Sequence, residues 1–132
     1  MNEIHVEVRR MLDLIHDRYS ERLTLDALER ALGHPSAYLS RLFRHETGIS
    51  IHDHVTRTRL ASAATLIRAG VKIEAVALSV GYQSKKNFYR QFKRQFGFTP
   101  EQYRRVERQG VTSTVTSSAV VSPPSWARHR ST

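Results

Sequence analysis

A repeat of 48 to 49 residues constrains the fold of this 132-residue chain more than any other feature of its sequence. In each copy a short apolar segment leads to a glycine, Gly33 or Gly81, and a longer segment then ends at a second glycine, Gly48 or Gly97. The offset is 48 residues up to the first glycine and 49 after it, so the second turn is one residue longer. Each copy is therefore predicted to form a helix-turn-helix, in which a glycine-containing turn joins a short and a longer helix. The side chains that correspond in type are Leu39 and Phe88, Arg41 and Arg90, Phe43 and Phe92, Arg44 and Lys93, and Ser50 and Thr99.

Two further helices are expected before and between the two copies. Apolar residues from Ile4 to Tyr19 recur at helical spacing and predict an opening helix that packs on the first copy. Ser50 is placed to cap a connector helix that runs to about Ala69. The apolar residues of this connector lie on two sides, which suits a helix that contacts both copies.

One last helix and a tail follow the second copy. Thr99 is placed as a cap, Pro100 as the first helical residue and Gln102 as the partner in a capping box, so a helix is expected from here to about Arg108. From Gly110 the chain is rich in Ser, Thr and Pro without a helical period, which predicts a disordered tail over residues 110–132. The predicted fold is all-α, with about seven helices in one domain over residues 1–109. Its parts are a first unit at about 5–49, a connector at about 50–69 and a second unit at about 71–108.

Positive charge is concentrated in the second copy. The whole chain has a formal net charge of +9, and residues 71–109 carry nine basic but only three acidic side chains. The segment 81–97 is predicted to be one amphipathic helix with Phe88, Phe92 and Phe96 on its apolar face and cations on the other. The positive charge of such a helix favours binding to a polyanion, and duplex DNA is the leading candidate for that partner. A basic surface that serves only solubility is the plain alternative, and the clustering of charge on one helix argues against it.

The composition argues against several other classes of protein. The chain has no cysteine, which excludes disulfides, thiolate metal sites and cysteine nucleophiles. It has neither a secretory-type start nor an apolar run close to the roughly 20 residues that cross a bilayer. His52 and His54 do not share a helical face, and no nucleophile elbow or phosphate-binding loop is present. We therefore expect no enzyme, no metal, no cofactor and no membrane association, and a cytoplasmic, nucleoid-associated location.

At the residues of the repeat and of the helix that follows it, the chain resembles the DNA-binding domain of the AraC/XylS family of bacterial transcription regulators. The resemblance covers roughly residues 5–107 and implies seven helices in two homeodomain-like helix-turn-helix subdomains, which both insert recognition helices into DNA. The family signature is a Gly-aromatic turn, a Phe-x-Arg-x-Phe-Lys helix, Gly-x-Thr-Pro and Tyr-Arg. It is present here as Gly81-Tyr82, residues 88–93, residues 97–100 and Tyr103-Arg104.

The chain departs from the family pattern at three places. His34-Pro35 stands where the family usually has a small polar cap before the first recognition helix. His54 stands where the family often has Tyr, and Lys86-Asn87 stands where it often has Ser-Tyr. The first two departures are expected to weaken local packing, and the third alters the surface that faces the bases.

The resemblance also implies which residues contact DNA. Arg41 and Arg90 lie off the apolar faces of their helices, and arginine prefers guanine through two parallel hydrogen bonds. Asparagine can bind adenine, whereas Ala37 offers only apolar contact with a thymine methyl group. For any single cation the plain alternative is a solvated surface charge. The base-contacting set is Ala37, Ser40 and Arg41 in the first unit and Lys85, Lys86, Asn87 and Arg90 in the second; Arg44, Lys93 and Arg94 are expected to contact phosphates.

Two hypotheses for the function remain open. The leading one is a sequence-specific regulator of transcription that binds double-stranded DNA as a monomer. Its two recognition helices would enter successive major grooves of an asymmetric site, because a connector of about 27–30 Å is close to one duplex turn of about 34 Å. RNA polymerase is an expected second partner, and a dimer is expected if an N-terminal domain belongs to the protein. The alternative is a helix-turn-helix interaction module that binds another regulator or RNA polymerase and has only non-specific affinity for DNA.

Overall fold

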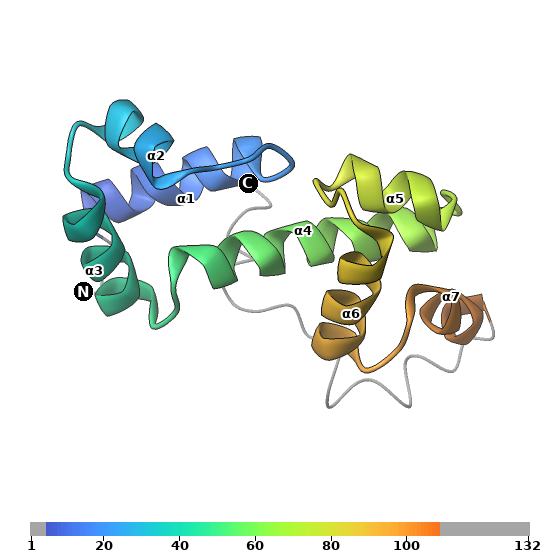
Figure 1. The fold of residues 1–132 in the computed structure, drawn as a ribbon. Helices are drawn as coiled ribbons and strands as arrows, with labels where there is room; N and C mark the ends of the chain where they lie inside the picture. The colour runs from blue at the N-terminus through green and yellow to red at the C-terminus, as the bar shows by residue number, and fades with distance from the viewer. Residues whose placement is uncertain (1–4, 109–132) are drawn as a thin grey trace. The chain divides into compact units, whose positions relative to one another are not determined.

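The computed structural model describes residues 5–108, and within them the chain forms seven α-helices and no strand (Figure 1). The predicted all-α fold is therefore confirmed over this part of the chain. Ile4 and the predicted disordered tail at 110–132 lie outside the described residues. The helices are α1 (Val6–Arg18), α2 (Leu25–Leu32), α3 (Ser36–Thr47), α4 (Ile51–Arg68), α5 (Ile73–Ser79), α6 (Lys85–Phe96) and α7 (Pro100–Arg108).

The helices group into two compact units, and the division falls inside α4, between Thr58 and Arg59. In the first unit, α1, α2 and α3 pack against one another (Figure 1). Burying a large apolar side chain stabilises a fold by about 1.5–3 kcal/mol, so the core residues hold these helices together. The core of the first unit consists of Val8, Met11, Ile15, Leu28, Leu32, Leu39, Phe43 and Val55.

Helix α1 has the apolar face that its sequence predicts, but the side chains of this face are not all equally buried. Val8, Met11 and Ile15 are fully buried, whereas Leu12 and Tyr19 are only partly buried against the same core. In the first part of α4, His54 is 2% exposed and its ring meets Phe43 edge-on, with the ring centroids 5.4 Å apart. The imidazole therefore fills a place in the core of the first unit.

The second unit is built around aromatic side chains, with α6 packed against both α5 and α7. Phe88 and Phe92 are fully buried, and Phe92 lies 5.5 Å from the ring of Tyr103 on α7 and 4.6 Å from Phe96. Phe96 is only partly buried, so it closes the edge of the apolar face of α6. The hydroxyl of Tyr89 on α6 donates a hydrogen bond to Glu101 of α7, which joins the same two helices at the surface.

The backbone repeats between the two units as the sequence repeat predicts. Helices α3 and α6 both have 12 residues, and both end at a glycine in the left-handed conformation. Gly48 has φ 83° and donates its amide to the carbonyl of Arg44, while Gly97 has φ 84° and donates to the carbonyl of Lys93. A side chain at either position would be strained at this φ, so glycine is the residue that ends each helix cleanly.

The beginning of α6 differs from the sequence prediction. The segment 81–97 was expected to form one helix, but the helix starts at Lys85 and residues 81–84 form a turn. The reason is local: Ser84 has extended backbone angles and its hydroxyl accepts a hydrogen bond from the amide of Asn87 at 3.1 Å, the geometry of an N-cap. Gly81 is part of the turn, with φ 103°.

The caps predicted for α4 and α7 are present. The hydroxyl of Ser50 accepts a hydrogen bond from the amide of Asp53 at 3.0 Å. Thr99 and Gln102 form the reciprocal capping box, with each side chain accepting from the backbone amide of the other residue at 3.2 and 2.9 Å. At the opposite end of α4, the guanidinium of Arg104 on α7 donates to the carbonyls of Ile67 and Val71.

Candidate nucleic-acid interface

Helix α3 presents the residues assigned to DNA in the first unit. Leu39 and Phe43 are fully buried and fix the rotation of the helix about its axis. The predicted contact residues recur every three or four residues and so share the side of the helix that lies away from this buried pair. Ala37, Arg41 and Arg44 are exposed, and Ser40 is half-buried. The structure therefore brings these four side chains onto the outer side of one helix.

The first turn of α3 takes its cap from another helix. Pro35 occupies the N-cap position with φ −61° and ψ 144°, and it has no side-chain oxygen that could accept a hydrogen bond. Instead, a carboxylate oxygen of Glu29 on α2 accepts from the amide of Ser36 at 2.7 Å. Sequence reasoning missed Glu29, because its distance of seven residues from Ser36 matches no local capping pattern. The contact exists only once the turn has formed.

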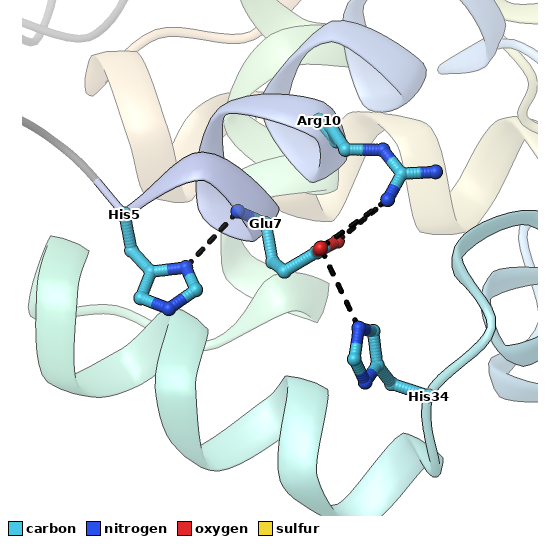
Figure 2. A network of polar contacts seen from close by, with 4 residues as sticks. All are labelled: His5, Glu7, Arg10 and His34. Atoms are coloured by element: carbon cyan, nitrogen blue, oxygen red, sulfur yellow. Dashed lines mark hydrogen bonds and ion pairs between the residues drawn. The ribbon is translucent and has the colours of Figure 1, made fainter.

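A network of polar side chains holds the turn before α3 to α1 (Figure 2). The carboxylate of Glu7 lies 2.9 Å from a guanidinium nitrogen of Arg10 and 3.4 Å from Nε2 of His34. Nδ1 of His5 caps α1 by accepting from the amide of Glu7. The ring of His34 also lies 5.3 Å from that of Tyr38 on α3. The His34-Pro35 turn, which was expected to weaken local packing, thus has partners on α1, α2 and α3.

Helix α6 presents a wider basic surface in the second unit. Phe88 and Phe92 are fully buried, while Lys86, Arg90, Lys93 and Arg94 are all exposed. No acidic residue interrupts this helix between Lys85 and Phe96. The predicted opposition of an apolar and a cationic face is therefore present, and the cationic face is open to solvent.

Lys85 is the one predicted base-contacting cation of α6 with an acidic partner. Its ammonium lies 3.2 Å from a carboxylate oxygen of Glu74 on α5 and 5.5 Å from the ring centre of Tyr89. Glu74 accepts from its own backbone amide and from Lys85, and both interactions lower the pKa of its carboxyl group. Glu74 was not singled out from the sequence, because it lies 11 residues from Lys85. Lys85 is thereby drawn toward α5 at the edge of the basic surface.

Asn87 and Arg90 interact directly on α6. A terminal guanidinium nitrogen of Arg90 donates to Oδ1 of Asn87 at 2.6 Å. Asn87 is half-buried, and its backbone amide is held by the Ser84 cap. The spacing of three residues places both side chains on the same side of the helix.

Neither a cluster of metal ligands nor a membrane-spanning helix is found among residues 5–108. No group of three or more His, Cys, Asp or Glu side chains that could hold a metal ion occurs between residues 5 and 108. None of the described helices is long and apolar enough to cross a membrane. The prominent chemical feature of residues 5–108 is a pair of matched helices that present Arg41 and Arg90 at corresponding positions.

Comparison with known proteins agrees with this geometry. Residues 28–106 match the model of a helix-turn-helix domain family. The chain is 32% identical over 98 residues to the regulatory protein SoxS of Escherichia coli, covering 74% of this chain and 92% of SoxS. It is 33% identical to the HTH-type transcriptional regulator MtrA of Neisseria gonorrhoeae over 72% of this chain. The C-terminal domain of AraT, a response regulator from Geobacillus stearothermophilus, matches with a TM-score of 0.76 and 34% identity, over 79% of this chain and 88% of that structure.

The fold and the matched basic helices define a helix-turn-helix DNA-binding domain of a transcription regulator. Within that class, the chain belongs to the AraC/XylS family. Its partner is DNA, and the family is not enzymatic, since the relatives are regulators of transcription. The length of the relatives varies: the chain spans 92% of SoxS but 32% of MtrA and 13% of the uncharacterised regulator YtdP of Bacillus subtilis.

Proposed function

We propose that the chain binds double-stranded DNA sequence-specifically and inserts α3 and α6 into successive major grooves of one asymmetric site. The observation that supports this most directly is the correspondence of Arg41 and Arg90. Both are exposed, both lie between two buried residues of a 12-residue helix, and both helices are preceded by a glycine-containing turn. In this proposal each helix enters one of two grooves that lie one duplex turn, about 34 Å, apart on the same face of DNA.

In this proposal the two arginines supply most of the base discrimination. A guanidinium donates two parallel hydrogen bonds to O6 and N7 of guanine, and such a contact contributes about 1–3 kcal/mol against the wrong base. Ala37 and Ser40 lie beside Arg41, and Lys86 lies one turn from Arg90. Arg44, Lys93 and Arg94 bind phosphates, which set the orientation of each helix without distinguishing sequences.

The two helices differ in how much general attraction they provide. Helix α6 has five cations and no acidic residue, whereas α3 has Arg41 and Arg44 together with Glu46. Each phosphate contact releases condensed counterions, so α6 contributes the larger share of the salt-dependent affinity. The first unit depends more on Arg41 for its preference. We further propose that the domain binds as a monomer and that RNA polymerase is its second partner.

Selection of bound sites from a pool of random duplexes tests the proposal first. The expected result is one asymmetric consensus with two conserved blocks about one helical turn apart. Arg90→Ala should then reduce the preference at one base pair by about 5- to 150-fold, which corresponds to 1–3 kcal/mol. Lys93→Ala should weaken all duplexes alike and reduce the slope of log K against log salt by about 0.9.

Arg22→Ala is a suitable control, because Arg22 is exposed in the turn between α1 and α2 and is not assigned to DNA. It should leave base preference unchanged. A random pool that yields no consensus, together with an Arg90→Ala variant that binds every duplex as before, would contradict the proposal. That result would favour the interaction module with only non-specific DNA affinity.

A further inference from the structure

The interaction between Asn87 and Arg90 gives the second recognition helix a feature that the first one lacks. Oδ1 of Asn87 accepts from Arg90 at 2.6 Å, while the backbone amide of Asn87 is anchored at 3.1 Å by the Ser84 hydroxyl. At the corresponding place of α3 stands Tyr38, whose ring lies against His34 at 5.3 Å. Arg41 corresponds to Arg90 in the repeat, but the residue three positions before it has no side-chain amide that could accept a hydrogen bond from it.

We infer that Asn87 is a positioning residue that holds the Arg90 guanidinium for base contact, and that it does not itself bind adenine. This inference rests on the proposed function, because it assumes that Arg90 contacts a base. It also replaces the adenine contact that the sequence suggested for Asn87. An asparagine that binds adenine must accept with Oδ1 and donate with Nδ2 in one plane, and here the carbonyl oxygen is already engaged along the helix.

The chemistry of arginine allows both interactions at once. A guanidinium has five N–H donors in a rigid plane, so one hydrogen bond to Asn87 leaves a pair of parallel donors for O6 and N7 of guanine. A free arginine has many rotamers, and fixing one of them before binding reduces the entropy that is lost on contact with DNA. The base preference that Arg90 provides should therefore depend on Asn87.

The test is a double-mutant cycle on the site selected from random duplexes, with the preference at every base pair measured for Asn87→Ala, Arg90→Ala and the double variant. We expect Asn87→Ala to weaken the preference by about three- to tenfold, within the usual coupling of contacting side chains, at the same base pair that Arg90→Ala affects. In the Arg90→Ala background, Asn87→Ala should have no further effect. Gln95→Ala, at the far end of α6, should leave every preference unchanged.

Asn87→Asp separates the two roles of the amide. Aspartate keeps the oxygen that accepts from Arg90 but loses the N–H that an adenine contact needs. Its negative charge lowers affinity for all duplexes alike, so the ratio of specific to random binding is the quantity to compare. We expect Asn87→Asp to keep the preference at the Arg90 base pair, and the acidic residue in the first turn of α6 also favours the helix.

Two results would overturn the inference while leaving the proposed function intact. One is a loss of preference in Asn87→Ala at a different base pair from that of Arg90→Ala, which would make Asn87 an independent contact. The other is an unchanged preference in Asn87→Ala at every base pair. If Arg90→Ala itself changes no preference, the assignment of α6 to base contact fails first and the inference fails with it.

Discussion

Helix α3 should lose stability when Glu29 of the preceding helix α2 is replaced by alanine. Glu29→Ala removes the carboxylate that accepts from the amide of Ser36 at 2.7 Å, the contact that replaces a side-chain cap at Pro35. Alanine is the best helix former, so α2 loses no helix propensity through the change. The expected loss of stability therefore comes from the first turn of α3, where the hydrogen bond to the amide of Ser36 is removed.

The magnitude follows from the type of contact. A hydrogen bond to a charged group contributes about 1.5–3 kcal/mol, and removal of an N-cap costs about 0.5–2 kcal/mol. Ser36 is half-buried, so water replaces part of the lost bond and the lower half of these ranges applies. We expect the free energy of unfolding to fall by about 1–2 kcal/mol. With a urea m-value near 2 kcal/mol/M, the midpoint should fall by roughly 0.5–1 M.

Urea unfolding followed by circular dichroism measures this change. Glu21→Ala is the matched control, because Glu21 forms an exposed pair with Arg18 at 3.1 Å and such pairs contribute about 0.2–1 kcal/mol. Pro35→Ser should rescue the loss, since Pro35 already has the extended backbone angles of an N-cap and serine adds the missing oxygen. A cost of Glu29→Ala no larger than that of Glu21→Ala would contradict the role of Glu29 as the cap of α3. A Pro35→Ser change that leaves the cost of Glu29→Ala unchanged would contradict it as well.

Three further predictions concern the second unit. Phe92→Ala should lower the free energy of unfolding by about 3–5 kcal/mol, because the ring is fully buried; a loss below about 2 kcal/mol in urea unfolding would contradict this packing. Thr99→Ala should cost about 1 kcal/mol in the same assay through loss of the cap of α7, and an unchanged midpoint would count against the capping box. Burial raises the pKa of Tyr82, Tyr89 and Tyr103 above the ordinary value of about 10, so the folded state keeps protons that the unfolded state releases. The contribution of these three tyrosines to stability should therefore be constant below about pH 10 and fall as the pH rises above it, and tyrosinate absorbance should appear only at higher pH; tyrosines that all titrate normally would contradict this.

Much of the fold was predictable because its signals are local. Apolar spacing predicted the buried faces of α1, α3 and α6, and short-range capping patterns predicted the starts of α4 and α7 within one residue. The repeat was a second source of information about helix positions, since the same order of helix, turn and helix could be recognised in both copies. Where a local signal was overlooked, the prediction was wrong: Ser84 is a good cap, yet the helix was expected to begin before it.

The contacts between helices could not be predicted in the same way. Glu29 meets Ser36, Glu7 meets His34 and Glu74 meets Lys85 only because packing brings separate helices together. None of these distances along the chain corresponds to a turn of helix. The exposure of the basic residues was predictable from the position of the phenylalanines, whereas the carboxylate that pairs with Lys85 lies on another helix and was not.

The Arg104 contact has a consequence for the order in which the chain folds during synthesis. The carbonyl of Ile67 receives its hydrogen bonds from a side chain that is made 37 residues later, so the end of α4 stays incomplete until α7 has left the ribosome. The core of the first unit, in contrast, is complete once Val55 has emerged. At about 5–20 residues per second, synthesis takes seconds to pass from Val55 to Arg104, so the core of the first unit can form before the end of α4 is completed.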